Sequence, residues 1–141
     1  MTRTEQESIL IVDDNMIFRD ALVQTLRTAN YHVITAETGE RAFVTLRDRS
    51  CRIDWLYSRA ALPGLIDGWI LADEYHDVHP GRAVIVSTAA TAGTRSSAPR
   101  DIVLKQPTPR VVSARLRHLI GRARQIRTAA RATADDHRRA A

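Results

Sequence analysis

Charged side chains follow the ends of several short apolar runs in this chain of 141 residues. Asp13 and Asp14 come directly after Ile9–Val12, and Arg59 comes two residues after Trp55–Tyr57. Two adjacent carboxylates can hold a hard cation such as Mg2+, but an isolated pair after an apolar run is more often a turn or a helix cap. The chemistry of the pair therefore depends on what the fold brings beside it.

The apolar runs indicate a parallel sheet. They lack the alternation of a half-exposed strand, as is usual for strands buried on both faces, and apolar residues at helical spacing lie between them. This order predicts an α/β fold with a doubly wound, five-stranded parallel sheet. The expected strands are Ile9–Val12, Tyr31–Ala36, Trp55–Tyr57, Ala83–Val86 and Ile102–Leu104. The expected helical stripes are Phe18, Leu22, Leu26 and Ala29; Ala42, Phe43 and Leu46; Leu71, Tyr75 and Val78; and Val112, Leu116, Leu119 and Ala123.

Ligands of a doubly wound sheet bind outside the carboxyl ends of its strands. Thr88 and Lys105 also follow strand ends, so we expect them near Asp13, Asp14 and Arg59. Lys105 is the only lysine among 21 basic residues, which indicates that a compact ammonium matters at this position.

Two segments depart from the regular alternation. Thr88–Arg100 has no large apolar side chain, so we expect the fourth helix to be short or missing. The last helical stripe continues beyond the expected domain, which predicts a long final helix with fraying or disorder from about Thr128. We divide the chain into an N-terminal extension at 1–7, a domain at 8–120, and a basic helix extension or disordered tail at 121–141.

Composition excludes several classes of protein. The net charge of +5 comes from residues 110–141, which carry nine arginines and two aspartates. A single cysteine, Cys51, excludes an internal disulfide, and the chain has neither a secretory signal nor an apolar run of about 20 residues. We expect a cytoplasmic protein without a membrane span.

Several motifs, in the correct order, resemble the receiver domain of response regulators in two-component signalling. The resemblance covers roughly residues 8–120 and implies a flavodoxin-like fold. Asp13 and Asp14 resemble the acidic pair that holds magnesium in this family, and Thr88 and Lys105 take the places of the residues that contact the phosphoryl group. The matching segments are Ile9–Asn15, Glu37–Ala42, Asp54–Gly64 with Asp67–Trp69, Thr88–Ala89 and Lys105.

The position of the phosphoacceptor departs from the family. The acceptor aspartate falls four residues before the proline of its loop, and four residues before Pro63 stands Arg59. A guanidinium is not nucleophilic and stays protonated at cellular pH, so it cannot accept a phosphoryl group. We expect Arg59 to form an ion pair with Asp13 or Asp14 in place of a cation, and we expect no cofactor, with magnesium binding weak or absent.

The positions that change conformation on phosphorylation in the family, Thr88, Ile102 and Lys105, include a second difference from it. Ile102 stands where the family usually has an aromatic residue that swings on phosphorylation. Gln106 follows Lys105, with Pro107 one residue later, so the family's cis proline bond is expected to be absent or displaced.

Our first hypothesis is therefore a stand-alone pseudo-receiver, not an enzyme, that binds a protein without being phosphorylated. The resemblance implies a histidine kinase, a phosphotransfer protein or another receiver as the partner. Homodimerisation through the last helix is a further interpretation. The expected contact face is the last helical stripe, Val112, Leu116, Leu119, Ala123 and Ile126.

Two alternatives remain open. The chain could be a working receiver that uses Asp13, Asp14 or Asp67 as a surrogate acceptor. It could also bind nucleic acid through its arginine-rich tail. We prefer a partner-contacting helix to the second alternative because the tail has no interleaved aromatic residues and no helix-turn-helix pattern, and Asp135-Asp136 interrupts it.

Overall fold

The computed structural model describes residues 6–89 and 100–140. It contains a five-stranded parallel sheet with the strand order β2-β1-β3-β4-β5. The strands are β1 (Ser8–Val12), β2 (His32–Ala36), β3 (Trp55–Arg59), β4 (Ile85–Thr88) and β5 (Ile102–Lys105). The predicted doubly wound α/β fold is confirmed, and β1 is buried along its whole length.

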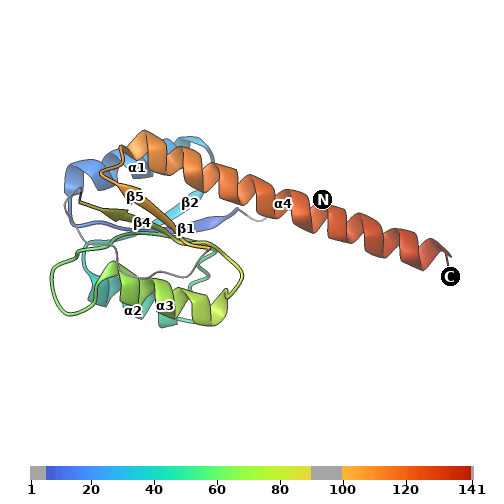
Figure 1. The fold of residues 1–141 in the computed structure, drawn as a ribbon, viewed down its shortest axis with the longest axis horizontal. Coiled ribbons are helices and arrows are strands. Elements are labelled where there is room, and N and C mark those ends of the chain that lie inside the picture. Colours follow the sequence, from blue (N-terminus) through green and yellow to red (C-terminus); the bar gives the residue numbers. More distant parts are fainter. Residues whose placement is uncertain (1–5, 90–99, 141) are drawn as a thin grey trace.

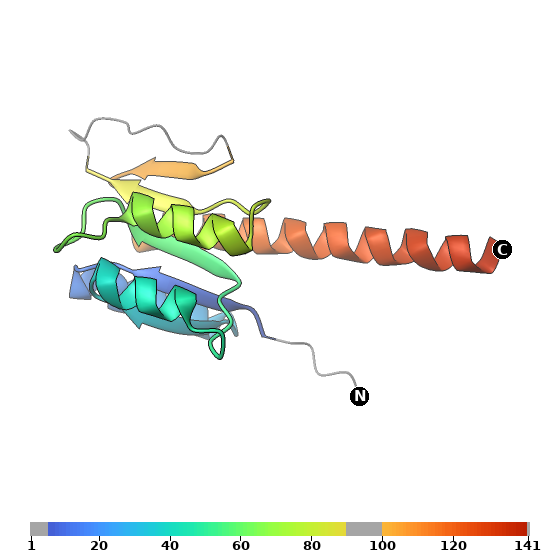
Figure 2. The ribbon, with the colours of Figure 1, turned by 90° about the horizontal axis from the view of Figure 1, so that it is seen from below.

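Helices cover both faces of the sheet (Figures 1 and 2). On one face, α1 (Met16–Thr28) and α4 (Pro109–Ala140) pack over residues such as Ile9, Ile11 and Tyr57. On the other face, α2 (Gly39–Arg47) and α3 (Gly68–Val78) cover Leu10 and Leu56. The alternation of side chains along each strand divides the apolar residues between these two cores.

Polar side chains that accept from backbone N–H groups set where the first three helices begin. The side chain of Asn15 caps α1, that of Thr38 caps α2 and that of Asp67 caps α3. Each accepts a hydrogen bond from the N–H three residues further on, which satisfies a donor that has no partner within the helix.

The last helix is long, as expected, and it continues through the residues for which fraying was expected. α4 has 32 residues and ends at Ala140. The expectation of a short or missing helix after β4 concerns residues 90–99, which lie outside the described part of the chain.

Two expectations about exposed and buried side chains were wrong. Val78 was expected on the apolar stripe of its helix with Leu71 and Tyr75, but it is 67% exposed at the end of α3. Val112 and Leu116 were assigned to a contact face, but both are buried against the sheet and α1. Their stripe faces the chain's own core, so they are not available to a partner. Leu119 and Ala123 pack against the same core, and Ile126 is exposed.

Among residues 6–89 and 100–140, no helix has both the length and the apolar character needed to cross a bilayer.

Candidate functional site

Arg59 and Asp14 meet at the carboxyl edge of the sheet. β1 and β3 are neighbours in register, with Val12 opposite Ser58, so the residues that follow both strands lie together. Arg59 Nη1 lies 3.5 Å from Asp14 Oδ1, and each side chain is about two-fifths exposed. The predicted ion pair is present, with Asp14 as the partner. Because water screens it, its contribution to stability is about 0–1 kcal/mol.

Asp13, in contrast, is buried and bound by other groups of the chain. Its Oδ1 accepts from the N–H of Asn15 at 2.9 Å, and its Oδ2 accepts from the hydroxyl of Tyr57 at 3.0 Å. Its backbone carbonyl accepts from Arg19 Nη1 at 2.8 Å. Burial raises the pKa of the Asp13 carboxyl, and the bonds from Asn15 and Tyr57 and the charge of Arg59 offset part of that rise.

Tyr57 lines the pocket beside Asp13, although its sequence pattern predicted only a buried strand residue. It is fully buried on β3, and its oxygen lies 2.8 Å from Ser87 Oγ on β4. Since the phenol donates its one proton to Asp13, the Ser87 hydroxyl is the donor in that second bond. Burial raises the pKa of Tyr57, so the phenol is neutral at physiological pH. Tyr57 lies two residues before Arg59 and shares its strand face, and a buried tyrosine hydroxyl needs a partner, which is the signal that could have identified it.

A cavity of about 210 Å³ opens between these strand ends. Thr88 lines it, as expected for a residue that follows β4. The lining residues are Asp13, Asn15, Phe18, Tyr57, Arg59, Ser87, Thr88, Ala89, Gln106 and Pro107.

Lys105 does not take the expected position in the cavity. It lies opposite Thr88 on β5, but its side chain is exposed, and it forms no ion pair with Asp13, Asp14 or another described residue. The expected role of Lys105 beside the acidic pair therefore stays a prediction. Ile102 packs partly buried against the core.

The backbone after Lys105 adopts a left-handed conformation at Gln106. Gln106 has a positive φ of 43°, and its N–H donates to the carbonyl of Thr88 at 2.8 Å. The bond between Gln106 and Pro107 is trans, as are the other described peptide bonds.

Asp67 and Gly68 join the start of α3 to the end of β3. Oδ1 of Asp67 accepts from the N–H of Ile70 at 2.9 Å as a helix cap. The N–H of Gly68 donates to the carbonyl of Ala60, and its Cα packs on the carbonyl of Arg59, where a Cβ would lie 2.2 Å from the oxygen. Glycine is therefore required where α3 meets the end of β3.

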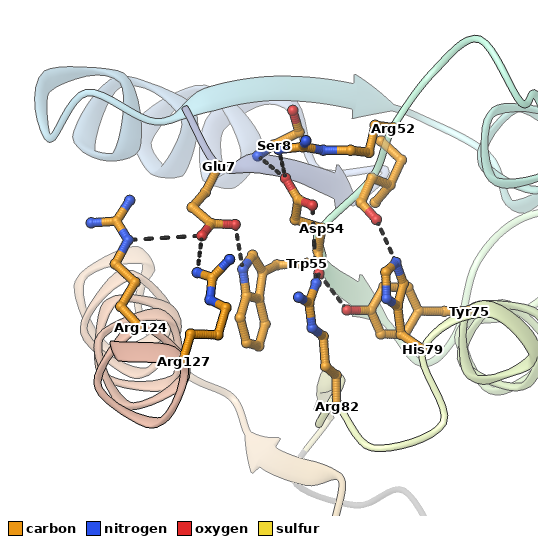
Figure 3. A network of polar contacts seen from close by, with 11 residues as sticks. Glu7, Ser8, Arg52, Asp54, Trp55, Tyr75, His79, Arg82, Arg124 and Arg127 are labelled. Atoms are coloured by element: carbon orange, nitrogen blue, oxygen red, sulfur yellow. Dashed lines mark hydrogen bonds and ion pairs between the residues drawn. The ribbon is translucent and has the colours of Figure 1, made fainter. Parts of the chain in front are cut away.

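A second polar cluster lies at the opposite, amino edge of the sheet (Figure 3). Glu7 is 5% exposed, and its carboxylate accepts from Trp55 Nε1 at 3.2 Å. Arg127 on α4 donates to the same carboxylate at 2.8 Å, and Arg124 lies 3.7 Å away. These contacts tie the last helix to the base of β1 and β3.

Asp54 extends this cluster toward α3. Its carboxylate accepts from the N–H of Ser8 at 2.9 Å and from Arg52 at 3.1 Å. Its carbonyl accepts from Arg82 Nη1 at 2.7 Å, and the Arg82 guanidinium stacks on the Trp55 ring, 4.8 Å from its centre. The cluster is a structural connection, because its carboxylates already face arginines of the same chain.

One curated protein matches a large part of the sequence, and no protein-family model matches it. A response regulator receiver protein of Anaeromyxobacter sp. (strain Fw109-5) is 35% identical over 104 residues, which are 74% of this chain and 42% of that protein. The chain thus spans less than half the length of this curated relative.

Solved receiver structures share the fold over nearly their whole length. A response regulator receiver protein from Sinorhizobium medicae WSM419 has a TM-score of 0.72 at 22% identity and covers 84% of this chain and 98% of its own. A response regulator from Chloroflexus aurantiacus J-10-fl, described as putative, has a TM-score of 0.65 at 25% identity and covers 83% and 99%. The receiver domain of the hybrid histidine kinase CckA has a TM-score of 0.65 at 24% identity and covers 79% and 97%. With the strand order and the sequence match, these likenesses show that the chain belongs to the response regulator receiver domain family.

Proposed function

We propose that this chain is a receiver that works by binding a protein and is not itself phosphorylated. The ion pair between Arg59 and Asp14 supports the proposal, because the resemblance to receivers assigns Arg59 to the position of the phosphoacceptor. Phosphoryl transfer to a receiver needs a carboxylate nucleophile, and a guanidinium does not provide one.

The residues of the pocket do not fit a magnesium ion. Mg2+ takes several oxygen ligands and favours sites rich in negative charge. Both oxygens of Asp13 already accept hydrogen bonds, and Asp14 faces the charge of Arg59. A dication near Asp14 would have to displace or repel that guanidinium. No step of the proposed function uses the ion.

A protein partner follows from the family. A histidine kinase, a phosphotransfer protein or a second receiver is the class of partner that we propose, and the CckA receiver is an example of this fold within a kinase. Exposed apolar side chains support docking: Met16 and Ile17 begin α1, between the pocket residues Asn15 and Phe18, and Leu65 lies in the loop after β3.

The direct test is incubation of the purified chain with a small phosphodonor and Mg2+, followed by intact mass measurement. We expect no gain of a phosphoryl group. A hydroxylamine-labile adduct would instead support the alternative of a surrogate acceptor. Asp14 is the exposed carboxylate of the pair, whereas Asp13 is buried and Asp67 caps a helix, so fragmentation would then be expected to map the adduct to Asp14.

Restoring the acid is the matched experiment. Arg59→Asp removes the cation and adds an oxygen ligand, so magnesium affinity should rise by about tenfold or more, which is about 1.4 kcal/mol. Isothermal titration of both proteins with MgCl2 measures this. The control is Arg41→Gln, which removes an exposed arginine of α2 outside the lining of the pocket. Equal affinity of Arg59→Asp and the parent would show that the charge argument is wrong.

A further inference from the structure

The distal half of α4 is a free helix. Ile120 is the last buried residue of α4, and every described side chain from Arg124 to Arg138 is exposed. At about 1.5 Å per residue, the helix after Arg127, which still contacts Glu7, projects roughly 20 Å beyond the core. Figures 1 and 2 show this segment standing away from the sheet, without another element beside it.

The direction of the projecting helix is set where it leaves the domain. Glu7 is buried there and holds Arg127 at 2.8 Å and Arg124 at 3.7 Å (Figure 3). Glu7 also accepts a hydrogen bond from Trp55 of β3, so these contacts connect this part of the helix to the sheet. The projecting segment is therefore presented at a defined angle.

A row of arginines runs along α4. Arginine recurs every seven residues, at positions 110, 117, 124, 131 and 138, and all five side chains are exposed. Seven residues are about 10.5 Å along a helix, and the row turns by only about 20° per step, so it extends roughly 42 Å along one side. Between residues 121 and 138 the helix carries five arginines and two aspartates.

The same segment lacks the apolar surface that a coiled-coil partner or a membrane would bind. Its only large apolar side chain is Ile126, so it has neither the apolar seam of a coiled coil nor the apolar face of a membrane-surface helix. A second copy of this helix would also bring arginines against arginines. Guanidinium groups in a row fit phosphates, which they bind with two parallel hydrogen bonds.

We infer that α4, through Arg117, Arg131 and Arg138 of this row, binds the phosphate backbone of duplex DNA without reading its sequence. A bare helix with alanines between its arginines fits a major groove of about 12 Å, whereas the deep groove of duplex RNA excludes it. Contacts with phosphate alone carry no sequence information. This binding is separate from the pocket at the carboxyl edge of the sheet and is additional to the proposed function.

The test uses the full chain and a fluorescent duplex DNA of arbitrary sequence, with anisotropy measured from about 50 to 200 mM salt. Arg131→Gln with Arg138→Gln removes two exposed arginines of the row. The control is Arg41→Gln with Arg49→Gln, which removes two exposed arginines of the domain and changes the net charge equally.

We expect the parent to bind with a steep salt dependence, and the helix variant to bind at least tenfold more weakly at the lowest salt. The slope of log affinity against log salt should fall by about two for the helix variant, since each phosphate contact contributes about 0.9. The control variant should lose less than threefold in affinity. Three results would overturn the inference: no binding at the lowest salt, equal loss in both double variants, or equal affinity for polyglutamate of matched charge.

Discussion

The Tyr57 hydroxyl donates to Oδ2 of Asp13 at 3.0 Å and links β3 to β1 inside the pocket. Ser87 on β4 completes the link at 2.8 Å from the same phenol oxygen. Of the adjacent carboxylates Asp13 and Asp14, the first is thus held by neutral groups of the chain and the second by Arg59. Both acids have structural partners, which is the basis of the first two predictions.

Tyr57→Phe removes the hydroxyl and leaves Oδ2 of Asp13 and the Ser87 hydroxyl without this partner in a buried place. We expect the free energy of unfolding to fall by about 1–3 kcal/mol, the range for an unsatisfied buried polar group. Urea denaturation measures the change. Tyr31→Phe is the matched control, because Tyr31 is only partly buried and its hydroxyl has no hydrogen bond within the described residues; a change under about 0.5 kcal/mol is expected there. An equal fall in the free energy of unfolding of both variants would show that the Tyr57 hydroxyl has no special structural role.

Asp13→Asn tests the raised pKa of the Asp13 carboxyl. Because the folded state binds the proton more tightly than the unfolded state, the ionised carboxyl lowers stability as pH rises from its ordinary value of 3.8 through the folded pKa. The stability of the variant relative to the parent should therefore rise with pH over that window, as measured by urea unfolding at several pH values.

Asp48→Asn provides a control of opposite sign for that experiment. Hydrogen bonds from Ser50 lower the pKa of Asp48, so its stabilisation is present above 3.8 and is lost as pH falls through the folded pKa. The stability of Asp48→Asn relative to the parent should fall as pH rises through this lower window. If both variants shift in the same direction, the assignment for Asp13 is wrong.

Glu7→Gln weakens the attachment of α4. The amide can still accept from Trp55, but the charge that holds Arg127 and Arg124 is lost. We expect a loss of about 1–3 kcal/mol in the free energy of unfolding, because hydrogen bonds to a charged, buried group are lost. Amide hydrogen exchange should also become faster in α4 from about residue 120 onward. Glu37→Gln changes an exposed carboxylate that lies 3.6 Å from the buried Arg19, and it should cost about 0–1 kcal/mol and leave exchange in α4 unchanged.

Gly68→Ala tests the close approach of α3 to Arg59. The new Cβ would lie 2.2 Å from the carbonyl oxygen of Arg59, so the loop or the helix must shift, and we expect a loss of about 1–3 kcal/mol. Gly121→Ala is the matched substitution at an open helical position, with nothing within 4 Å, and should stabilise the protein by up to about 1 kcal/mol. Thermal unfolding of both variants gives the comparison, and a neutral Gly68→Ala would contradict the packing described for the site.

The sequence by itself determined the fold and the chemical type of the site. Continuous apolar runs and helical stripes are local patterns, so they identified all five strands and placed Asp13, Asp14 and Arg59 at one edge of the sheet. The position of Arg59 before Pro63 is a property of the chain alone, and it is the basis for proposing a receiver without its acceptor.

Only the tertiary structure decided which groups meet. It paired Arg59 with Asp14, bound Asp13 to Tyr57 and Tyr57 to Ser87, and left Lys105 exposed. It also joined Glu7 to Arg127, 120 residues away, and buried the stripe of α4 that looked available to a partner. Side-chain direction and burial depend on what packs against each element, and local spacing in a sequence does not contain that information.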